Sequence, residues 1–441
     1  MINKILMFFV NLMQKYLPDP FTIAWLITLV VCALALIFTP ATPLDLANYW
    51  GSSFFGILSF AMQMVMLLIS GYALASAPII RKWLARVALV PKTPRQVVLM
   101  VGFISMGLFY LNWGLGLIAA AFLAREVARA HPHVDMRVIV AAGFSGIIIT
   151  HGGLSASIPL LINTPGHFLE SEIGLIPLSQ TIFGAQSLFI TIALAVIIPF
   201  VCTLMLPKEG AMVADPALLK ETPDASGEPE TTQIADKLDN SRILNWLLVA
   251  MGVAYVAHLC WEGKFSLNIN LLVFIFIILG IAMHGSLIRY SRACARGAST
   301  CSGIILQFPF YAGIMGIMNG SGLVELISQL LLALASPHTY ELFCYLSSLI
   351  ISVFVPSAGG HWVVQAPFML PPAHELGVPI WKVAMGVAWG ESIWNVVCPF
   401  WALPLLAIAK ISLRDLIGFT VLLFIVGNLV VFAGFWIFPG V

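Results

Sequence analysis

The stretch VPSAGGHWVVQ, residues 355–365, decides the fold, because it interrupts an apolar segment where lipid would leave its backbone unpaired. The residues before it, LFCYLSSLIISVF (342–354), and after it, APFML (366–370), are largely apolar. Irregular backbone is tolerated inside a membrane only where protein buries it or where it lines a wet cavity. The interruption therefore predicts a binding site built into a membrane protein.

Composition places the whole chain in the membrane. Hydrophobic residues make up 60% of the 441 residues and charged residues only 9%, whereas soluble domains average about 25% charged residues. The apolar runs are long enough for helices and lack the alternation of barrel strands. The net charge of +1 gives no sign of nucleic-acid binding. The seven Cys are scattered without a Cys-x-x-Cys or Cys/His cluster, which argues against a metal or redox site.

Nine long apolar runs predict membrane crossings. They are 21–39, 54–75, 138–163, 186–206, 243–260, 266–284, 301–319, 383–409 and 415–437. Two other apolar stretches, 97–124 and 341–372, are interrupted by polar residues and glycines.

The basic residues predict how the chain threads the membrane. All Lys and Arg except Lys264 and Lys382 fall in six segments: 1–20, 76–96, 125–137, 207–242, 285–300 and 410–414. Basic segments favour the cytoplasmic side. The nine crossings then alternate only if 97–124 enters and leaves from the cytoplasm and 341–372 enters and leaves from outside. Both are predicted as re-entrant hairpins, with the N-terminus inside and the C-terminus outside.

A polar segment divides the chain into two comparable halves. Residues 207–242 contain many Pro, Ala, Thr and acidic residues and no aromatic residue, and predict a flexible cytoplasmic linker. Residues 1–206 and 266–441 carry the same order of elements, and the extra crossing 243–260 makes the second half face the other way. The predicted fold is an all-α integral membrane protein with an inverted repeat, as in secondary transporters.

The hairpin tips supply the first candidate site residues. One tip is YLNWGLG (110–116) and the other is VPSAGGHW (355–362). Their glycines allow tight turns, and the exposed N–H groups at the start of a half-helix suit a carboxylate. The alternative is a pair of kinked, structurally buried helices. The predicted substrate-binding residues at the tips are Asn112, Trp113, Gly114, Ser357, Gly359, Gly360, His361 and Trp362.

The spans that follow the hairpins are predicted to be broken as well, one in each half. They read THGGLSASIPLLINTPG (150–166) and WGESIWNVVCPFWALP (389–404), and Pro159 and Pro399 each remove a backbone hydrogen bond. The polar side chains at these breaks complete the predicted site: Ser155, Ser157, Asn163 and Asn395 for substrate, and Glu391 and Ser392 for a coupling ion.

Glu391 is the only one of the 20 acidic residues well inside a predicted span. An intramembrane carboxylate is costly and indicates function. Glu391 could carry a proton or help to hold Na⁺ together with freed carbonyls. The alternative is a structural carboxylate bonded to Trp or Ser. His361 and His151 are further candidates for proton carriers.

The chain resembles the short-chain fatty acid transporter family, the AtoE-type permeases, nearly from end to end. The resemblance is carried by YLPDP (16–20), NWGLGL (112–117), FLAREVAR (122–129), SIPLLINTPG (157–166), LQFPFYAGIMG (306–316), VPSAGGHWVVQAPFMLPPA (355–373) and PFWALPLLAIA (399–409). The family pattern is Gly-rich near 151–153, where this chain has His151, and that departure argues against an obligatory role for this histidine.

The resemblance implies uptake of acetoacetate, butyrate and similar monocarboxylates across a bacterial cytoplasmic membrane, with Na⁺ or H⁺ as coupling ion and no other cofactor. It also implies membership of the ion-transporter superfamily, whose better-known members are homodimers with elevator motion. Three alternatives stay open: a di- or tricarboxylate transporter of the same superfamily, an intramembrane enzyme using Glu391 and His361, and a passive channel. The lack of Lys or Arg at the tips and breaks favours a monoanion, and the lack of a phosphate-binding loop argues against ATP as the driver.

Overall fold

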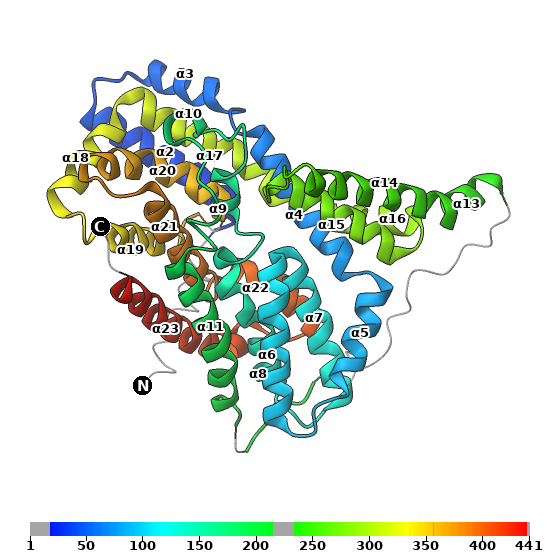
Figure 1. The fold of residues 1–441 in the computed structure, drawn as a ribbon. Coiled ribbons are helices and arrows are strands. Elements are labelled where there is room, and N and C mark those ends of the chain that lie inside the picture. The colour runs from blue at the N-terminus through cyan, green and yellow to red at the C-terminus, as the bar shows by residue number, and fades with distance from the viewer. Residues whose placement is uncertain (1–17, 208, 215–232, 356, 439–441) are drawn as a thin grey trace.

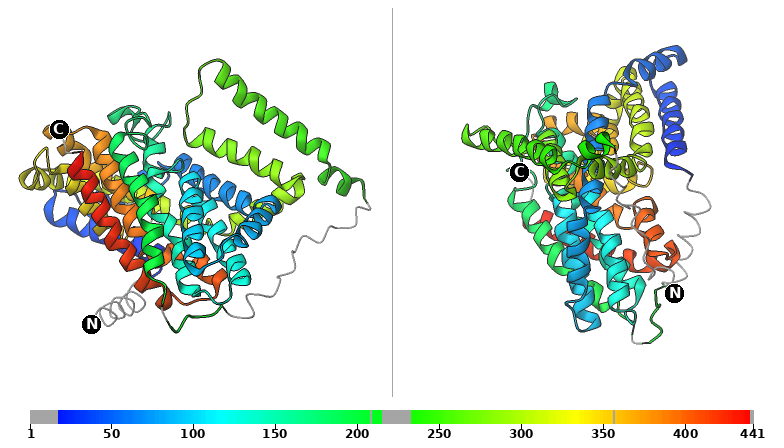
Figure 2. Two further views of the ribbon diagram at one scale, coloured as in Figure 1. Left: turned by 60° about the horizontal axis from the view of Figure 1, so that its bottom comes forward. Right: turned by 90° about the vertical axis from the view of Figure 1, so that its right-hand side faces the viewer.

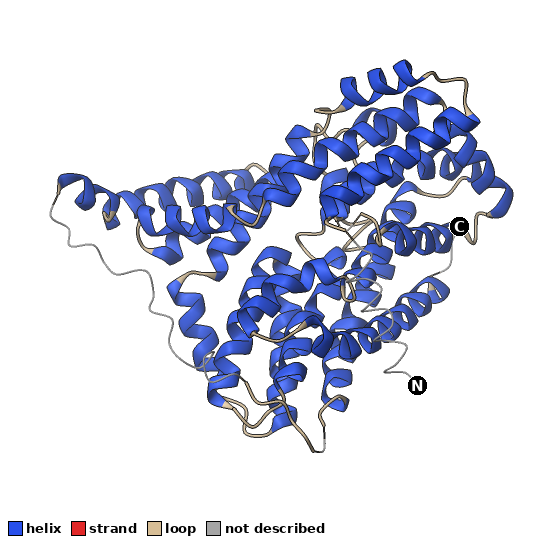
Figure 3. Cartoon of the chain, turned by 180° about the vertical axis from the view of Figure 1, so that it is seen from behind, coloured by secondary structure: helices blue, strands red, loops and turns tan. Residues whose placement is uncertain are grey.

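The computed structural model describes residues 18–207, 209–214, 233–355 and 357–438. Its regular elements within these ranges are helices, as Figure 3 shows. The predicted all-α class is thereby confirmed. The predicted linker 207–242 lies largely outside the described residues, and its described part includes the short helix α13 (Ile234–Asp239).

Seven helices or helix runs of the described chain are long and apolar enough to cross a membrane, which makes this a multi-pass membrane protein. These are Phe21–Phe38, Leu58–Ala75, Pro94–Leu111, Met136–Ile162, Ala185–Leu204, Ile234–Trp261 and Leu413–Ile437. An eighth candidate is the pair Leu287–Ala298 and Ser302–Ser321, which is bent by 52°. The predicted crossing 266–284 is shorter in the structure, with 16 helical residues, and the predicted crossing 383–409 is two helices.

The described part of the first half folds into eleven helical pieces. They are α2 (Pro20–Phe38), α3 (Pro43–Ser53), α4 (Leu58–Ala75), α5 (Pro78–Ala88), α6 (Pro94–Leu111), α7 (Trp113–Ala130), α8 (Met136–Phe144), the 3₁₀ helix η1 (Ser145–Gly152), α9 (Ser157–Ile162) and α10 (Glu170–Ile173), followed by α11 (Ala185–Leu204), which closes the half. Figure 1 shows α6, α7 and α8 side by side, and they also contact one another.

The second half follows the same order after one extra helix. It contains α14 (Arg242–Trp261), α15 (Ile269–His284), α16 (Leu287–Ala298), α17 (Ser302–Ser321), α18 (Leu323–Leu334), α19 (Tyr340–Ile351), α20 (Ala358–Leu376), α21 (Ile380–Asn395), α22 (Pro399–Ala409) and α23 (Leu413–Ile437). In both halves two helices are followed by a long helix with a short one, a helix pair, an interrupted helix and a final long helix. The inverted relation between the halves stays a prediction.

Both predicted hairpins are pairs of helices in contact. In the first, α6 and α7 are joined by Asn112 alone, so the pair covers 94–130 rather than 97–124. In the second, α19 and α20 are joined by residues 352–357, and the pair covers 340–376 rather than 341–372. The 18-residue helix α6 is itself long enough to cross a membrane. Re-entry from one face therefore stays a prediction for both pairs.

Both predicted broken spans are interrupted, at places that differ slightly from the predicted ones. The first leaves helical geometry at Gly153–Ala156, and Pro159 lies in the first turn of α9, where it removes no intrahelical hydrogen bond. The second stops after Asn395 and restarts at Pro399, the first residue of α22. Pro159 thus follows its interruption instead of causing it.

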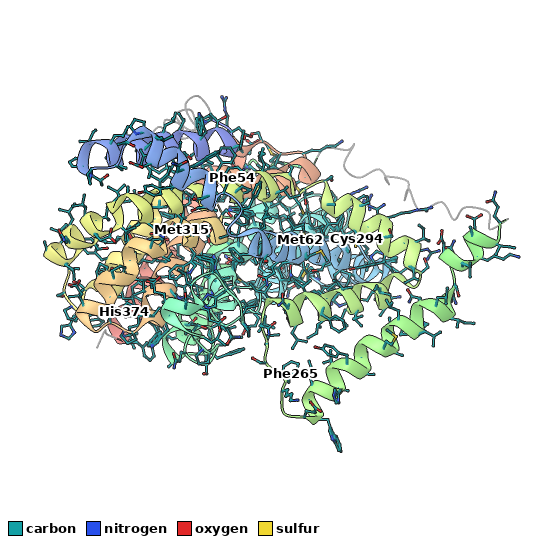
Figure 4. All side chains as sticks on the ribbon, turned by 90° about the horizontal axis from the view of Figure 1, so that it is seen from above. Phe54, Met62, Phe265, Cys294, Met315 and His374 are labelled. Carbon is teal, nitrogen blue, oxygen red and sulfur yellow. The ribbon has the colours of Figure 1, made fainter. Side chains whose placement is uncertain are left out.

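The extra helix α14 stands apart from the rest of the molecule. Figures 1 and 2 show it projecting from the main body together with α13, and α15 is the helix it packs against. Figure 4 shows Phe265, in the loop after α14, far from the central helices. Only 17% of the Ile234–Trp261 window is buried. An apolar helix with so little protein contact is suited to a lipid environment.

Candidate functional site

A pocket lies where the predicted tips and breaks meet. It has about 570 Å³ of space between protein atoms, its open mouth included. Both halves of the chain supply its walls: Met64, Phe109, Trp113, Leu117, Ile147, Thr150, His151, Ser155 and Ser157 from the first, and Ile304, Phe308, Ser357, Gly359, Glu391, Asn395 and Trp401 from the second. Small-molecule sites combine apolar walls with a few polar groups in this way.

The first turns of four helices reach this pocket. Trp113 opens α7, Ser157 opens α9, Ser357 caps α20, and Trp401 lies in the first turn of α22. The first four N–H groups of a helix have no partner within that helix, and the aligned peptide dipoles give this end a partial positive charge. Four such ends around one cavity favour a negatively charged ligand.

The first tip is fixed by Asn112, which is fully buried. Its Oδ1 accepts a hydrogen bond from the Leu115 N–H at 2.9 Å, and its Nδ2 donates to the Leu67 carbonyl at 3.5 Å. Asn112 therefore caps α7 and anchors it to α4. The Trp113 N–H donates to Ser155 Oγ at 2.9 Å, which joins the tip to the break in the following span.

Three predicted residues of the first half have different places. The Trp113 ring lines the pocket and lies edge-on to Trp401, with ring centroids 5.6 Å apart. Gly114 does not line it, and a Cβ there would lie 3.2 Å from the Leu68 side chain. Asn163 also lies outside the lining, since its Nδ2 donates to the Leu267 carbonyl at 2.7 Å.

The second tip divides into pocket residues and supporting residues. Ser357 and Gly359 line the pocket, and Ser357 Oγ accepts a hydrogen bond from the Gly360 N–H at 3.4 Å. Gly360 faces Tyr311, whose ring would be 2.3 Å from a Cβ at that position. Trp362 is fully buried outside the lining.

His361 belongs to a network inside the α19–α20 pair rather than to the pocket lining. Its Nδ1 faces Ser352 Oγ at 3.2 Å, and its Nε2 is hydrogen-bonded to Gln365 Oε1. Gln365 in turn donates to Ser347 Oγ at 2.7 Å. Both ring nitrogens are thus occupied, and the imidazole ties the two arms together.

The polar groups of the second break meet those of the first. Glu391 is fully buried, and its Oε2 is hydrogen-bonded to His151 Nε2. Ser392 Oγ donates to the Ile148 carbonyl at 2.9 Å and lies 3.2 Å from Thr150 Oγ1. The sequence indicated Glu391 and Ser392 and named His151 and Glu391 separately as proton carriers, but it gave no sign that these two side chains touch.

Four polar atoms of the pocket lining lack a hydrogen-bond partner among the described residues. They are His151 Nδ1, Glu391 Oε1, Asn395 Oδ1 and Trp113 Nε1. A buried polar atom left unpaired costs about 1–3 kcal/mol. These atoms are therefore suited to bind water or a polar ligand in the pocket.

The charges of the lining are few. Among the described residues of the lining there is no Lys or Arg; His151 is the one side chain of this set able to become cationic, and Glu391 the one able to become anionic. The structure adds Thr150 and the aromatic residues Phe109, Phe308 and Trp401 to the residues singled out from the sequence. Among the described residues no group of three His, Cys, Asp or Glu could hold a metal ion.

Comparisons with known proteins agree with a transporter. A family model described as "Short chain fatty acid transporter" matches residues 1–438. A protein of Escherichia coli (strain K12) named "Putative short-chain fatty acid transporter" is 40% identical over 428 residues, which is 96% of this chain and 97% of the relative. A protein of Haemophilus influenzae with the same name is 40% identical over 431 residues, 95% and 96% of the two chains.

Two solved structures have a similar fold. The YdaH transporter of Alcanivorax borkumensis has a TM-score of 0.60 at 17% identity, over 95% of this chain and 98% of that one. MtrF of Neisseria gonorrhoeae has a TM-score of 0.53 at 15% identity, over 98% and 97%. At these identities the likeness speaks to the fold alone.

Proposed function

The chain belongs to the short-chain fatty acid transporter family, and on this premise we propose that it imports short monocarboxylates such as butyrate and acetoacetate together with a proton. The pocket is the proposed substrate site. The hydrogen bond between His151 and Glu391 in the pocket wall is the observation that carries the proposal.

The lining fits a small monoanion. Helix N-termini and one imidazole surround the cavity, and the aromatic rings of Phe109, Phe308 and Trp401 offer an apolar wall to a short carbon chain. A dicarboxylate would bring a second negative charge, for which the described part of the lining holds no Lys or Arg. Monocarboxylates therefore suit this pocket better than di- or tricarboxylates.

The His151–Glu391 pair gives a physical reason for coupling to a proton. With the carboxylate ionised, His151 Nε2–H donates to Glu391, and the unpartnered Nδ1 carries a lone pair that repels an anion. Protonation turns Nδ1 into a donor that can bind the substrate carboxylate. An anion entering alone would leave two negative charges in a dry site, its own and that of Glu391. An anion that enters with a proton leaves a net charge of minus one, the same as in the empty site.

Sodium is a less suitable partner for the same groups. One oxygen of Glu391 is already hydrogen-bonded to His151, and the Ile148 carbonyl of η1 already accepts from Ser392 Oγ. The family resemblance supports a bacterial cytoplasmic membrane and a homodimer for this proposal. The distribution of Lys and Arg supports an N-terminus inside and a C-terminus outside.

Uptake into proteoliposomes tests the proposed function. Labelled butyrate would be offered with an imposed pH gradient or an imposed Na⁺ gradient, each varied alone, and uptake by protein-free liposomes would be subtracted because the undissociated acid crosses lipid unaided. Saturable accumulation driven by the pH gradient is expected. Accumulation driven only by Na⁺ would contradict proton coupling, and non-saturable equilibration would indicate a channel.

A further inference from the structure

A second buried carboxylate lies outside the pocket. Glu341, in the first turn of α19, is 4% exposed, and its Oε1 has no hydrogen-bond partner among the described residues. Gln186, at the start of α11, and Lys382, at the start of α21, interact with this carboxylate, and the Cys344 thiol lies one turn further along α19. The proposed substrate site makes no use of Glu341.

Polar side chains continue from Glu341 along α11. Ser187 and Thr191 are four residues apart, about one helical turn or 6 Å along the axis. They are 2% and 5% exposed. Both hydroxyls and Gln186 Oε1 lack a hydrogen-bond partner within the described chain. Unpaired polar atoms are costly in an apolar interior, so bound water between them accounts for the three atoms together.

The inner end of this row reaches the coupling pair. A Cβ on Gly152 would lie 2.0 Å from Thr191 Oγ1 and 2.8 Å from the Trp389 ring, so Thr191 sits directly against the residue after His151. The Nδ1 of His151 is one of the unpartnered atoms. The row therefore spans the distance between two titratable sites, Glu341 and the His151–Glu391 pair.

The same two sites also lie along α21. A Cβ on Gly386 would be 3.5 Å from Glu341 Cγ. Gly386 precedes Glu391 by five residues, which is about 7.5 Å along a helix. Between them, Trp389 is fully buried with an unpartnered Nε1. Two or three water molecules are enough to connect groups at such a separation.

We propose that Glu341 and the polar side chains of α11 form the proton route to the His151–Glu391 pair, with Glu341 as its terminal carrier. This inference rests on the proposed function. A proton from outside is taken up by the Glu341 carboxylate and passes to the pair through a chain of waters held by Gln186, Ser187 and Thr191. Each water accepts one proton and donates another, and the His151–Glu391 pair takes up the last one. No electrons move, and the pair reaches the protonated form that binds the anion.

The charged groups around both ends agree with this role. Lys382 on α21 is the cationic group that interacts with Glu341, and Cys344 is its other titratable neighbour. On the pocket side, His361 on α20 interacts electrostatically with the His151–Glu391 pair, while its ring nitrogens contact Ser352 and Gln365. A purely structural ion pair between Glu341 and Lys382 would link the starts of α19 and α21. It would not explain the unpaired hydroxyls of α11.

Two transport modes separate this role from a structural one. Net uptake driven by a pH gradient requires the carrier to take up a new proton from outside in every cycle, whereas counterflow exchange of labelled for unlabelled butyrate lets the loaded carrier shuttle with its proton bound. Glu341→Gln should slow net uptake by about tenfold or more, since an amide cannot relay a proton, and should leave exchange unchanged. Thr191→Val should slow net uptake selectively as well, and Thr191→Ser should restore it.

The matched control is Glu325→Gln, which changes an exposed carboxylate on α18 and should alter neither mode. Equal loss of net uptake and exchange in folded Glu341→Gln would overturn the proton route, and so would full activity in both modes. If Glu341→Gln does not fold, the two Thr191 variants test the proton route instead. Net uptake should be slowed selectively in Thr191→Val and restored in Thr191→Ser. Absence of both modes in the unchanged protein would contradict the proposed function instead.

Discussion

His151 and Glu391 are 240 residues apart in the sequence, and their hydrogen bond joins the two halves of the chain at the pocket. The sequence alone was enough to single out Glu391, because a carboxylate inside an apolar span is conspicuous. It could not reveal the partner. A contact between distant residues is fixed by packing of the halves, and the Gly-rich family pattern near 151–153 argued against His151.

Replacing Glu391 by Gln should abolish concentrative uptake of butyrate and leave the protein folded. The amide keeps the shape and a hydrogen bond to His151, but it cannot provide the negative charge that stabilises a protonated imidazole. Uptake into proteoliposomes under a pH gradient, with thermal unfolding as the check on folding, measures this. Unchanged accumulation would remove Glu391 from the coupling role.

Replacing His151 by Gln should weaken butyrate binding and remove its dependence on pH. A hydrogen bond to a charged group is worth about 1.5–3 kcal/mol, or about 10–100-fold in affinity. In the unchanged protein affinity should fall as pH rises, because the proton needed for binding is lost. His258→Gln, at an exposed position on α14, is the control. If His151→Gln kept the pH dependence of butyrate affinity, that dependence would belong to another group.

The glycines of the second tip show where prediction from the sequence stops. Gly359 and Gly360 were equivalent in the pattern, yet Gly359 borders the pocket and Gly360 faces the Tyr311 ring. Which of two adjacent glycines faces the ligand depends on the rotation of α20. A bulky residue at 360 would therefore act by displacing Tyr311, and loss of binding there would not by itself show that the tip lines the site.

At the scale of helices, the sequence predicted which segments are irregular better than where they change direction. The first tip at Asn112 and the two interrupted spans lie where polar and glycine-rich residues indicated them. The second tip, 352–357, overlaps the predicted 355–362 only in part, because 358–362 belong to α20. The arms of both pairs are longer than predicted, since apolar periodicity fades at helix ends where caps such as Asn112 decide the boundary. His361 was predicted at the substrate, and the structure places it between the arms.

The start of α8 depends on one buried carboxylate. Asp135 accepts from the Arg137 side chain at 2.6 Å and from the Met212 N–H at 3.0 Å, and it caps α8. Burial alone would raise the pKa of Asp135, but the hydrogen bonds from Arg137 and Met212 outweigh it and hold this pKa below the usual 3.8. The ionised form therefore stabilises the fold above that value.

Asp135→Asn should lower the melting temperature near neutral pH, because losing one partner of a buried charge pair is costly. The difference from the unchanged protein should shrink as the pH falls below 3.8 towards the lower pKa of the folded state, since protonation then removes the same charge. Thermal unfolding in detergent across this pH range measures it. An equally large difference at all pH values would assign the effect to packing.

For the molecule as a whole, the order of the main helices is alike in the two halves, and α10, α13 and α14 have no counterpart among the described elements. Distribution of Lys and Arg predicted opposite orientations of the halves, because loop charge is visible in a sequence. The sequence could not predict how the halves pack to enclose a pocket. That packing depends on side chains such as Phe109 and Phe308, which apolar patterning cannot distinguish from lipid-facing ones.

Labelling with a membrane-impermeant maleimide tests this topology. His133→Cys, in the loop between α7 and α8, and His374→Cys, in the last turn of α20, each add a thiol at an exposed position, with the native exposed Cys260 replaced first. His374→Cys should react in intact cells, and His133→Cys only after permeabilisation, because the hairpins are predicted to open on opposite faces. Reaction of both from the same side would contradict the inverted arrangement.

The proposed link between butyrate binding and protonation of the pocket can be measured as the number of protons taken up per bound anion. Purified protein would be titrated with butyrate near neutral pH, where the free acid is fully ionised, in buffers that differ in ionisation enthalpy. Uptake of about one proton per bound anion is predicted, because binding and protonation of the His151–Glu391 pair are linked, and His151→Gln should take up none. Binding of butyrate without proton uptake by the unchanged protein would contradict the account.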